Sequence, residues 1–331
     1  MSTIKYNRER TATCAYAPNT PIAHDEVTAW ARRARSWSQP PAVGDVIDQR
    51  YRLERLLGRG GFGAVFQAQD LVREVPVALK VLAVERRSAS QWRFRRAGRL
   101  LCELRHPGVI AGLACGADGP LEYVAMEYLP SSLDLQQVLD ASGEALHWTD
   151  AVQYTTELLG ALDFLHSRGV VHRDIKPRNA LLTGRGVVLI DFDLAKQIQV
   201  GVKDSGEFDL NAVADEKTRP GLTGTPLYMP PERMDGQSAG PSADLYGGAL
   251  VLFVLLTSKL PSDFSVQPMT LRELRSVRRL RPPHLHTGLG LDVPAELDAY
   301  LRRALDPEPA ERFPDAAAMC EALAAILLKH G

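Results

Sequence analysis

The period of the apolar positions changes along this chain. Residues 51–57 and 64–69 alternate between apolar and polar, and 77–80 is a short apolar run, which together predict three strands joined by turns. Further on, apolar residues within 151–166 recur at helical spacing and predict an amphipathic helix. The apolar run 247–257 is far shorter than the ~20 residues that span a bilayer, so it predicts a buried helix. The first part of the chain is therefore expected to be rich in strands and the last part rich in helices.

Residues 1–44 lack this patterning and are expected to form an extension outside the folded domain. They contain four prolines and many small polar residues, a composition that does not favour a packed core. Within them, apolar residues including Trp30 and Trp37 fall at helical spacing, with arginines on the other faces. The segment 25–37 is either a short helix that covers its own domain or frays, or a docking element for a partner or a regulatory cap.

Composition narrows the class of protein. The chain has 331 residues, of which 45% are hydrophobic and 24% charged, and a formal net charge of -1. Such a balance is typical of a globular protein and gives no overall field toward nucleic acid or membrane, so neither is expected as a partner. The four cysteines are scattered without a C-x-x-C pair, and the first ten residues lack an apolar stretch. These features predict reduced thiols in a cytoplasmic protein.

A polar octapeptide, residues 172–179, follows the predicted amphipathic helix and precedes two short apolar runs. It has the form H-R-D-x-K-x-x-N. The octapeptide resembles the catalytic loop of the eukaryotic-type protein kinases. The resemblance implies that Asp174 accepts the proton of an incoming hydroxyl, that Lys176 neutralises the phosphoryl group in transfer, and that Asn179 holds a metal ion.

A glycine-rich turn, residues 58–63, joins the first two predicted strands. The G-x-G-x-x-G pattern is a weak signal alone, but here a strand follows it and not a helix. We therefore expect a strand–turn–strand flap whose backbone N–H groups approach phosphates, because no Cβ intervenes. The third predicted strand ends in V-A-L-K, which resembles the family element whose lysine, here Lys80, contacts the phosphates.

The resemblance implies a complete ATP site with Mg²⁺ or Mn²⁺. Met126 would be the gatekeeper, the backbone of 127–129 would bind adenine, and Leu181 would form the floor. Asp191, in the tripeptide D-F-D, would hold the metal together with Asn179. The residues expected to bind nucleotide are Gly58, Gly60, Gly61, Gly63, Val65, Ala78, Lys80, Met126, Glu127, Leu129 and Leu181.

The sequence departs from the family pattern in the helix expected between residues 88 and 104. The family has a glutamate there that pairs with the strand lysine, and counting back from the following histidine–proline pair places Ala97 at its position. Lys80 would then need another partner, for which Glu85, Asp191 or a separate protein are candidates. Ala97→Glu is therefore expected to raise ATP affinity or turnover by a modest amount.

A second departure is Asp193, which replaces the glycine of the family tripeptide D-F-G. Glycine permits backbone rotations that an aspartate restricts. Asp193 either limits such movement, adds a carboxylate near the metals, or is merely tolerated.

The long charged stretch 194–222 is expected to form a mobile activation loop. Arg173, beside the predicted catalytic aspartate, is of a type that commonly pairs with a phosphate on this loop. Thr218 and Thr223 lie where that phosphate could be attached. We therefore expect autophosphorylation at one of these two threonines.

The segment that ends this loop, G-T-P-L-Y-M-P-P-E, resembles the family's substrate platform. Thr225 would shape the site for a serine or threonine acceptor, and Glu232 would form a buried ion pair with Arg312. Asp244 would tie the following helix to the catalytic loop. An arginine-rich run is interpreted as a solvated helix face, or alternatively as a patch for acidic substrates. It consists of Arg272, Arg275, Arg278, Arg279 and Arg281.

Taken together, the motifs cover residues 45–330 and resemble the bacterial Hanks-type serine/threonine protein kinases. The resemblance implies an α+β, two-lobed fold with a first lobe of residues 45–129 and a second of 130–331. It implies ATP-dependent phosphorylation of serine or threonine in a protein substrate, including autophosphorylation. A pseudokinase that binds nucleotide or acts as a scaffold is the alternative, and a small-molecule kinase is less favoured because the platform suits a peptide.

Overall fold

The structure is a computed structural model of the chain. The structure describes residues 40–60, 63–83, 89–198, 225–237, 240–264, 271–280 and 282–331. The expected elements at 25–37, Gly61, Glu85, Thr218 and Thr223 lie outside these ranges.

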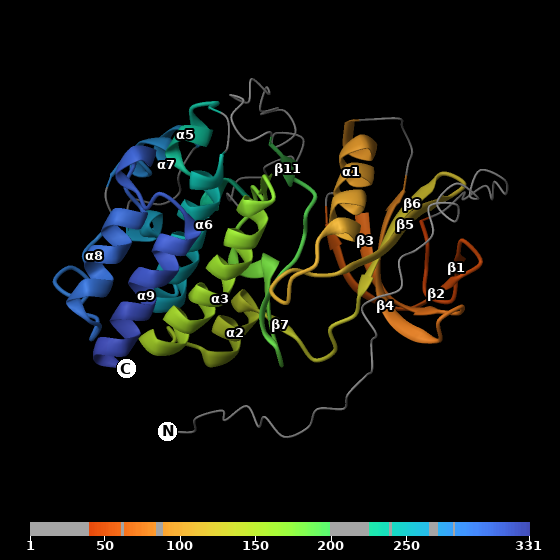
Figure 1. The fold of residues 1–331 in the computed structure, drawn as a ribbon, viewed down its shortest axis with the longest axis horizontal. Helices are drawn as coiled ribbons and strands as arrows, with labels where there is room; N and C mark the ends of the chain where they lie inside the picture. The colour runs from red at the N-terminus through yellow and green to blue at the C-terminus, as the bar shows by residue number, and fades with distance from the viewer. Residues whose placement is uncertain are drawn as a thin grey trace.

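The first lobe is a single antiparallel sheet with one helix packed on it (Figure 1). Six strands lie in the order β1-β2-β3-β4-β6-β5. Their bounds are Val46–Ile47 for β1, Tyr51–Gly60 for β2, Gly63–Asp70 for β3, Val75–Ala83 for β4, Gly112–Asp118 for β5 and Leu121–Glu127 for β6. The helix α1 spans Ala89–Glu103 and packs against β5. All three predicted strands are present, and the helix expected over 88–104 is confirmed.

The two faces of this sheet differ in what they bury. Phe66 on β3 and Leu79 on β4 are buried and belong to a small core on one face. Val65 and Lys80 alternate with them and are only half-buried on the opposite face. The strand register places Val65 opposite Lys80 and Met126 opposite Ala78, so these four residues share that face. The register therefore brings predicted nucleotide-site residues of three strands together.

The second lobe is mainly helical (Figure 1). Its helices are α2 (Leu135–Ser142), α3 (Trp148–Ser167), α5 (Pro231–Met234), α6 (Pro241–Thr257), α7 (Leu271–Val277), α8 (Ala295–Ala304) and α9 (Ala316–His330). Fourteen residues of α6 are buried, which confirms the buried helix predicted at 247–257 and extends it toward the N-terminus. The helix predicted at 151–166 is confirmed within α3, which packs on both α6 and α9.

Short strands of the second lobe carry the polar loops. The strands β7 (Leu133–Asp134), β9 (Ala180–Thr183) and β10 (Gly186–Leu189) form one sheet, and β8 (Val170–Val171) pairs with β11 (Lys196–Gln197). β11 lies within residues 194–222, which were expected to be irregular, and it forms because this part of the chain pairs with β8. The α+β, two-lobed architecture expected from the sequence is confirmed. Among the described helices, none combines the length and apolar character needed to cross a bilayer.

Candidate active site

The predicted catalytic loop is fastened to the buried helix α6. Asp244, in the first turn of α6, accepts hydrogen bonds from the backbone N–H groups of His172 at 2.8 Å and Arg173 at 2.7 Å. The Nε2 of His166 lies 3.0 Å from the same carboxylate. Burial opposes the charge of Asp244, but the hydrogen bonds and charge of its partners outweigh it and lower its pKa. The predicted tie between Asp244 and the loop is therefore present, and it fixes backbone atoms.

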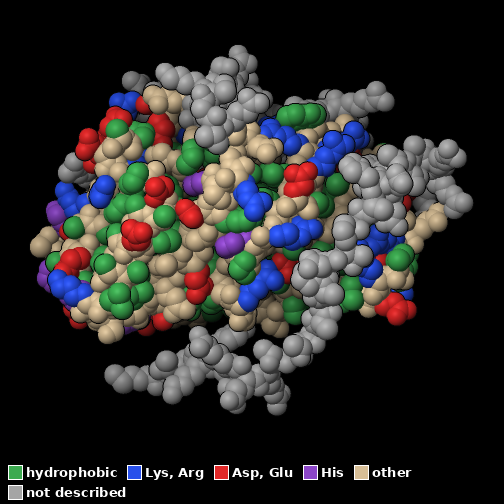
Figure 2. Space-filling view, in the orientation of Figure 1, with side chains coloured by type: hydrophobic (Ala, Val, Ile, Leu, Met, Phe, Trp, Pro, Cys, Tyr) green, Lys and Arg blue, Asp and Glu red, His purple; other side chains and the backbone are tan. Residues whose placement is uncertain are grey.

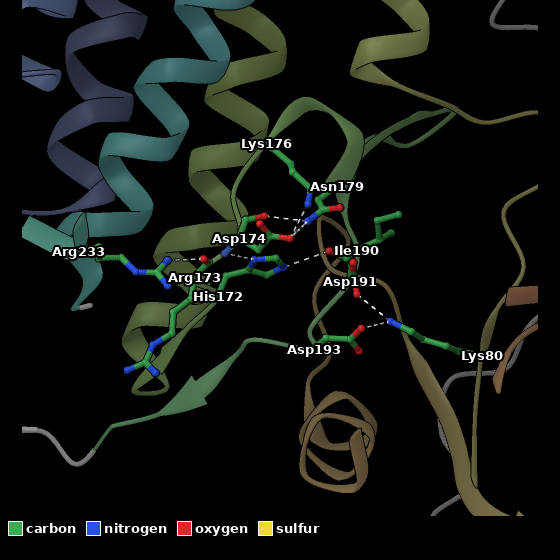
Figure 3. Close-up of polar contacts among 10 residues, drawn as sticks. All are labelled: Lys80, His172, Arg173, Asp174, Lys176, Asn179, Ile190, Asp191, Asp193 and Arg233. Carbon is green, nitrogen blue, oxygen red and sulfur yellow. Dashed lines mark hydrogen bonds and ion pairs between the residues drawn. The ribbon is translucent and has the colours of Figure 1, made fainter. Parts of the chain in front are cut away.

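The His172 side chain connects this loop to the D-F-D segment. Its Nε2 donates to the carbonyl oxygen of Ile190 at 3.0 Å, which leaves Nδ1 to accept the backbone N–H of Asp174 at 3.3 Å. Its ring meets the ring of Phe192 edge to face at a centroid distance of 4.8 Å. Phe192 is thereby held in the core, and Asp191 projects toward β4 (Figure 3).

Two residues of this region hold a backbone conformation that most side chains avoid. Arg173 has a φ of 71° and Asp191 a φ of 64°. Non-glycine residues in the left-handed region cost free energy and persist where their surroundings fix them. Here the hydrogen bond to Asp244 fixes Arg173, and the buried Phe192 fixes the residue before it.

Asp174 is the centre of a compact polar cluster (Figure 3). Its Oδ2 accepts a hydrogen bond from Lys176 Nζ at 2.7 Å and one from Asn179 Nδ2 at 2.9 Å. The same Asn179 amide donates to the backbone carbonyl of Asp174 at 2.8 Å, so its own carbonyl oxygen is left for another partner. Oδ1 of Asp174 is buried and has no hydrogen-bond partner among the described residues. A buried acceptor without a donor is costly unless it serves a further group.

Lys80 reaches across from the first lobe to the D-F-D segment. Its Nζ lies 2.8 Å from Asp191 Oδ1 and 2.5 Å from Asp193 Oδ2 (Figure 3). Burial alone would lower the pKa of Lys80, but the charges of the two aspartates outweigh it and raise that pKa. Burial likewise opposes ionisation of Asp191, yet the charge of Lys80 lowers its pKa to about 2. Burial and the neighbouring charge of Asp191 raise the pKa of Asp193.

This geometry corrects the expectation for Ala97. Lys80 does not lack a carboxylate, because Asp191, one of the three candidates, and Asp193 both contact it. Ala97 is 7% exposed and belongs to the hydrophobic core. From the sequence, Asp193 was expected to restrict backbone rotation, to add a carboxylate near the metals or to be merely tolerated, and its contact with Lys80 was missed. Only the fold shows it, since Lys80 and Asp193 are 113 residues apart.

The glycine-rich turn connects β2 to β3 as predicted. Gly63 has a φ of 117°, and an added Cβ would collide with the carbonyl oxygen of Val81, so the fold itself requires glycine there. Around Gly58, in contrast, an added Cβ would meet nothing within 4 Å. Packing therefore does not explain Gly58. Gly60 ends β2, and Gly61 lies outside the described residues.

The apolar residues expected around adenine come from both lobes. Met126 and Leu129 are half-buried at and after the end of β6, and Leu181 is half-buried on β9. β6 ends at Glu127. The side chain of Glu127 is engaged by Arg185 at 2.8 Å and 2.5 Å and by the backbone N–H of Ala111 at 2.9 Å. These contacts hold the chain where it passes between the lobes.

The predicted substrate platform rests on a buried ion pair. Arg312 binds Glu232 through two parallel hydrogen bonds of 2.8 Å and also donates to the carbonyl of Asp306. The predicted contact between Glu232 and Arg312 is therefore present. Thr225 begins a short 3-10 helix, Thr225–Tyr228, of which the structure describes the Thr225 backbone but not its side chain.

One arginine of the run 272–281 differs from its interpretation as a solvated helix face. Arg278 lies just past α7, is 2% exposed and donates to the carbonyl of Leu227, so it is not part of a solvated face. Arg279 fits the solvated interpretation better, in an exposed ion pair with Asp235 at 2.6 Å. The side chains of Arg272 and Arg275 and the whole of Arg281 are not described. The buried site of Arg278 could not be seen in the sequence, because its partner lies 51 residues away.

A further contact with the catalytic loop was missed by sequence reasoning. Arg233, on α5, is 3% exposed and donates from Nη1 to the carbonyl of Arg173 at 2.6 Å (Figure 3). The pKa of Arg233 is lowered to about 10, mainly by burial and to a lesser extent by the charge of Arg173. Its position next to Glu232 is the only signal in the sequence, and that signal does not reveal the contact.

Comparison with known proteins agrees with this geometry. A family model described as the protein kinase domain matches residues 51–323. Serine/threonine-protein kinase PksC of Streptomyces coelicolor is 34% identical over 82% of this chain and 48% of its own length. PknB of Mycobacterium tuberculosis is 32% identical over 82% of this chain and 42% of its own length. The chain thus spans about half or less of the length of these relatives.

The match to one solved structure covers most of both chains. The crystal structure of the PknI kinase domain of Mycobacterium tuberculosis superposes with a TM-score of 0.64 at 27% identity. The match covers 87% of this chain and 99% of that one. The chain therefore belongs to the protein kinase family, among relatives named as bacterial serine/threonine-protein kinases.

Proposed function

We propose that this chain transfers the γ-phosphoryl group of ATP to serine or threonine hydroxyls of proteins, its own included. The observation that carries the proposal is the cluster around Asp174, which accepts hydrogen bonds from both Lys176 and Asn179. Phosphoryl transfer demands positioning and charge stabilisation more than covalent chemistry. An arrangement fastened through Asp244 to a buried helix supplies that positioning.

The residues fit a nucleotide and a divalent metal. Open space at Gly58 leaves room for phosphates, and half-buried Val65, Ala78, Met126 and Leu181 offer apolar surface for a base. The carbonyl oxygen of Asn179 and the carboxylate of Asp191 are hard oxygen ligands of the kind that Mg²⁺ or Mn²⁺ prefers. Such metals commonly take one or two protein ligands and complete their shell with phosphate oxygens and water. When bound, the metal would neutralise charge on the transferring phosphates.

Each residue then has a definite task. Asp174 orients the acceptor hydroxyl and takes its proton, for which its unpartnered Oδ1 is suited. Lys176 stabilises negative charge on the transferring group, and Lys80 holds the phosphates from the side of the first lobe. Asn179 and Asp191 hold the metal. Thr225 and Glu232 form the platform for the acceptor peptide.

The test is transfer of label from γ-³²P-ATP with Mg²⁺, comparing wild type with Asp174→Asn. Wild type should incorporate label, and Asp174→Asn should lose about 10²–10⁴-fold in rate while retaining nucleotide binding. Asp191→Asn should weaken metal-dependent nucleotide binding as well. If wild type binds ATP without transferring label, the pseudokinase alternative is correct. Near wild-type turnover in Asp174→Asn would mean that another residue is the base.

Autophosphorylation is proposed at Thr218 or Thr223, with Arg173 as the partner of the phosphate. Alanine at both threonines should lower activity, and mass spectrometry of the active protein should find phosphate on one of them. Active protein unmodified at both positions would contradict this.

The segment 25–37 stays a proposed docking element, with no nucleic-acid or membrane partner proposed. The free thiols of Cys102, Cys115 and Cys320 support a cytoplasmic location.

A further inference from the structure

Lys80 takes both of its carboxylate partners from the D-F-D segment. Nζ contacts Asp191 and Asp193 at 2.8 Å and 2.5 Å, and no other ion pair of Lys80 occurs in the described part of the chain (Figure 3). An ammonium group on a side chain that is only 15% exposed needs such partners, because burial penalises its charge. The two aspartates therefore decide where Lys80 points.

Helix α1 has no carboxylate that could replace Asp191 and Asp193 as a partner of Lys80. Its inward face is apolar near Lys80, where Gly98 packs so closely that an added Cβ would lie 2.7 Å from Val124 Cγ2. Val124 is the cross-strand neighbour of Lys80 on β6. The outward side of α1 is basic, and Figure 2 shows Lys and Arg side chains gathered over it. The one acidic residue of α1 is Glu103, which is exposed at the last position of the helix.

The two aspartates are not equivalent. The Asp191 side chain is 34% exposed, whereas that of Asp193 is 10% exposed. Asp191 is also the residue placed to hold a metal, and a metal would draw its charge away from Lys80. Asp193 would then be the carboxylate that still neutralises and aims the lysine.

The backbone holds Asp193 in this position without strain. Its φ is outside the left-handed region, so a residue with a Cβ is accommodated where the family has glycine. The turn is closed by a hydrogen bond from the N–H of Ala195 to the carbonyl of Phe192 at 3.0 Å. Phe192 is in turn packed against His172. The carboxylate of Asp193 is thus presented to Lys80 by a segment anchored in the second lobe.

We propose that Asp193 is the positioning residue that orients Lys80 toward the nucleotide phosphates, in a role for which α1 carries no carboxylate. The inference rests on the proposed ATP site but not on transfer itself. It has a structural consequence: the lysine is tied to the second lobe instead of to α1. Displacement of α1 therefore leaves the Lys80 ion pairs intact, whereas displacement of the D-F-D segment breaks both.

A double-mutant cycle between Lys80 and Asp193 tests the proposal. Asp193→Asn keeps the size of the side chain and removes its charge, and Lys80→Ala removes the group on which it acts. The dissociation constant of a fluorescent ATP analogue with Mg²⁺ is measured for wild type, both single variants and the double variant. Asp193→Asn should weaken binding roughly tenfold when Lys80 is present and leave it unchanged in the Lys80→Ala background. An equal loss in both backgrounds overturns the proposal and indicates that Asp193 acts on the metal.

Moving the carboxylate from position 193 to position 97 gives an independent test of the proposal, which applies if Asp193→Asn folds poorly. Asp193→Gly should weaken binding, and adding Ala97→Glu to it should recover at least part of the affinity by returning the carboxylate to α1. Failure of Ala97→Glu to recover any affinity in a folded double variant counts against a role through Lys80. Asp235→Asn, which removes an aspartate from a surface pair with Arg279, is the matched control and should bind as wild type does.

These outcomes separate the inference from the proposed function. Nucleotide binding is measured without transfer, so coupling between Lys80 and Asp193 supports the inference even in a protein that transfers no label. Steady-state kinetics add a further readout where transfer occurs. The KM for ATP should rise in Asp193→Asn more than the KM for the acceptor protein, because Lys80 faces phosphates and not the acceptor.

Discussion

The two halves of the site are held in place by different means. In the second lobe, Asp174 is 8% exposed on a loop whose backbone is bound by Asp244, itself 1% exposed on a fully packed helix. In the first lobe, the nucleotide side consists of half-buried side chains and a glycine turn with open space at Gly58. The ion pairs of Lys80 with Asp191 and Asp193 join the halves.

The difference matches what the proposed function requires of each half. Acid–base chemistry requires the acceptor, base and phosphoryl group to be placed accurately before reaction, which favours a preorganised second lobe. A nucleotide must enter and leave, which favours a first lobe that closes through a few charged contacts. The comparison predicts that substitutions in the contacts that hold the catalytic loop lower the unfolding free energy. Substitutions on the nucleotide side should mainly alter the affinity for nucleotide.

The largest effect is expected for Asp244→Ala. Removal of this carboxylate leaves two backbone N–H groups and His166 without their acceptor in a buried place. Breaking a buried, hydrogen-bonded charge in this way costs about 3–5 kcal/mol in free energy of unfolding. Urea denaturation measures the loss, and transfer activity should fall with it. A loss below about 1 kcal/mol would mean that the loop is held by its other contacts.

The lowered pKa of Asp244 predicts how the unfolding free energy depends on pH. The pKa of Asp244 is lowered in the folded protein, so its stabilising effect is complete above the unfolded value of about 4 and disappears as pH falls through the folded value. The difference in unfolding free energy between wild type and Asp244→Asn should therefore be constant from pH 8 to pH 6 and shrink in acid. A difference that grows in acid would have the wrong sign for this residue.

A smaller, paired effect is expected within the glycine turn. Gly63→Ala forces a Cβ against Val81 at a φ of 117° and should lower the unfolding free energy by about 1–3 kcal/mol. Gly58→Ala meets no neighbour and should leave stability within about 0.5 kcal/mol, yet weaken nucleotide binding. Thermal denaturation and ATP titration of both variants separate the roles. Equal destabilisation by both would show that Gly58 is also structural.

The smallest effect is expected for Ala97→Glu in the otherwise unchanged protein. Lys80 already has two carboxylate partners, so a third should raise neither ATP affinity nor turnover. The position is 7% exposed, and burial of an added charge there carries its own cost. Kinetic measurement of the variant checks this directly. A clear gain would show that the contacts of Asp191 and Asp193 leave Lys80 poorly oriented.

The sequence by itself determined the elements and the local motifs. The period of two in residues 51–69 and the apolar run that became α6 depend only on neighbouring residues, since a buried face must be apolar at the repeat of its element. The loop from His172 to Asn179 also carries its chemistry within eight residues. Its acid, lysine and amide meet in the structure because a short, fixed loop leaves few other arrangements.

The tertiary structure decided which residues act on one another across long separations. Nothing local to residue 193 indicates that its carboxylate meets Lys80, and nothing local to Arg278 indicates that it is buried against Leu227. Nor does the sequence distinguish Gly63, which packing requires, from Gly58, which it does not. These contacts arise when strands, helices and loops pack together, and their partners are set by position in space and not by spacing along the chain.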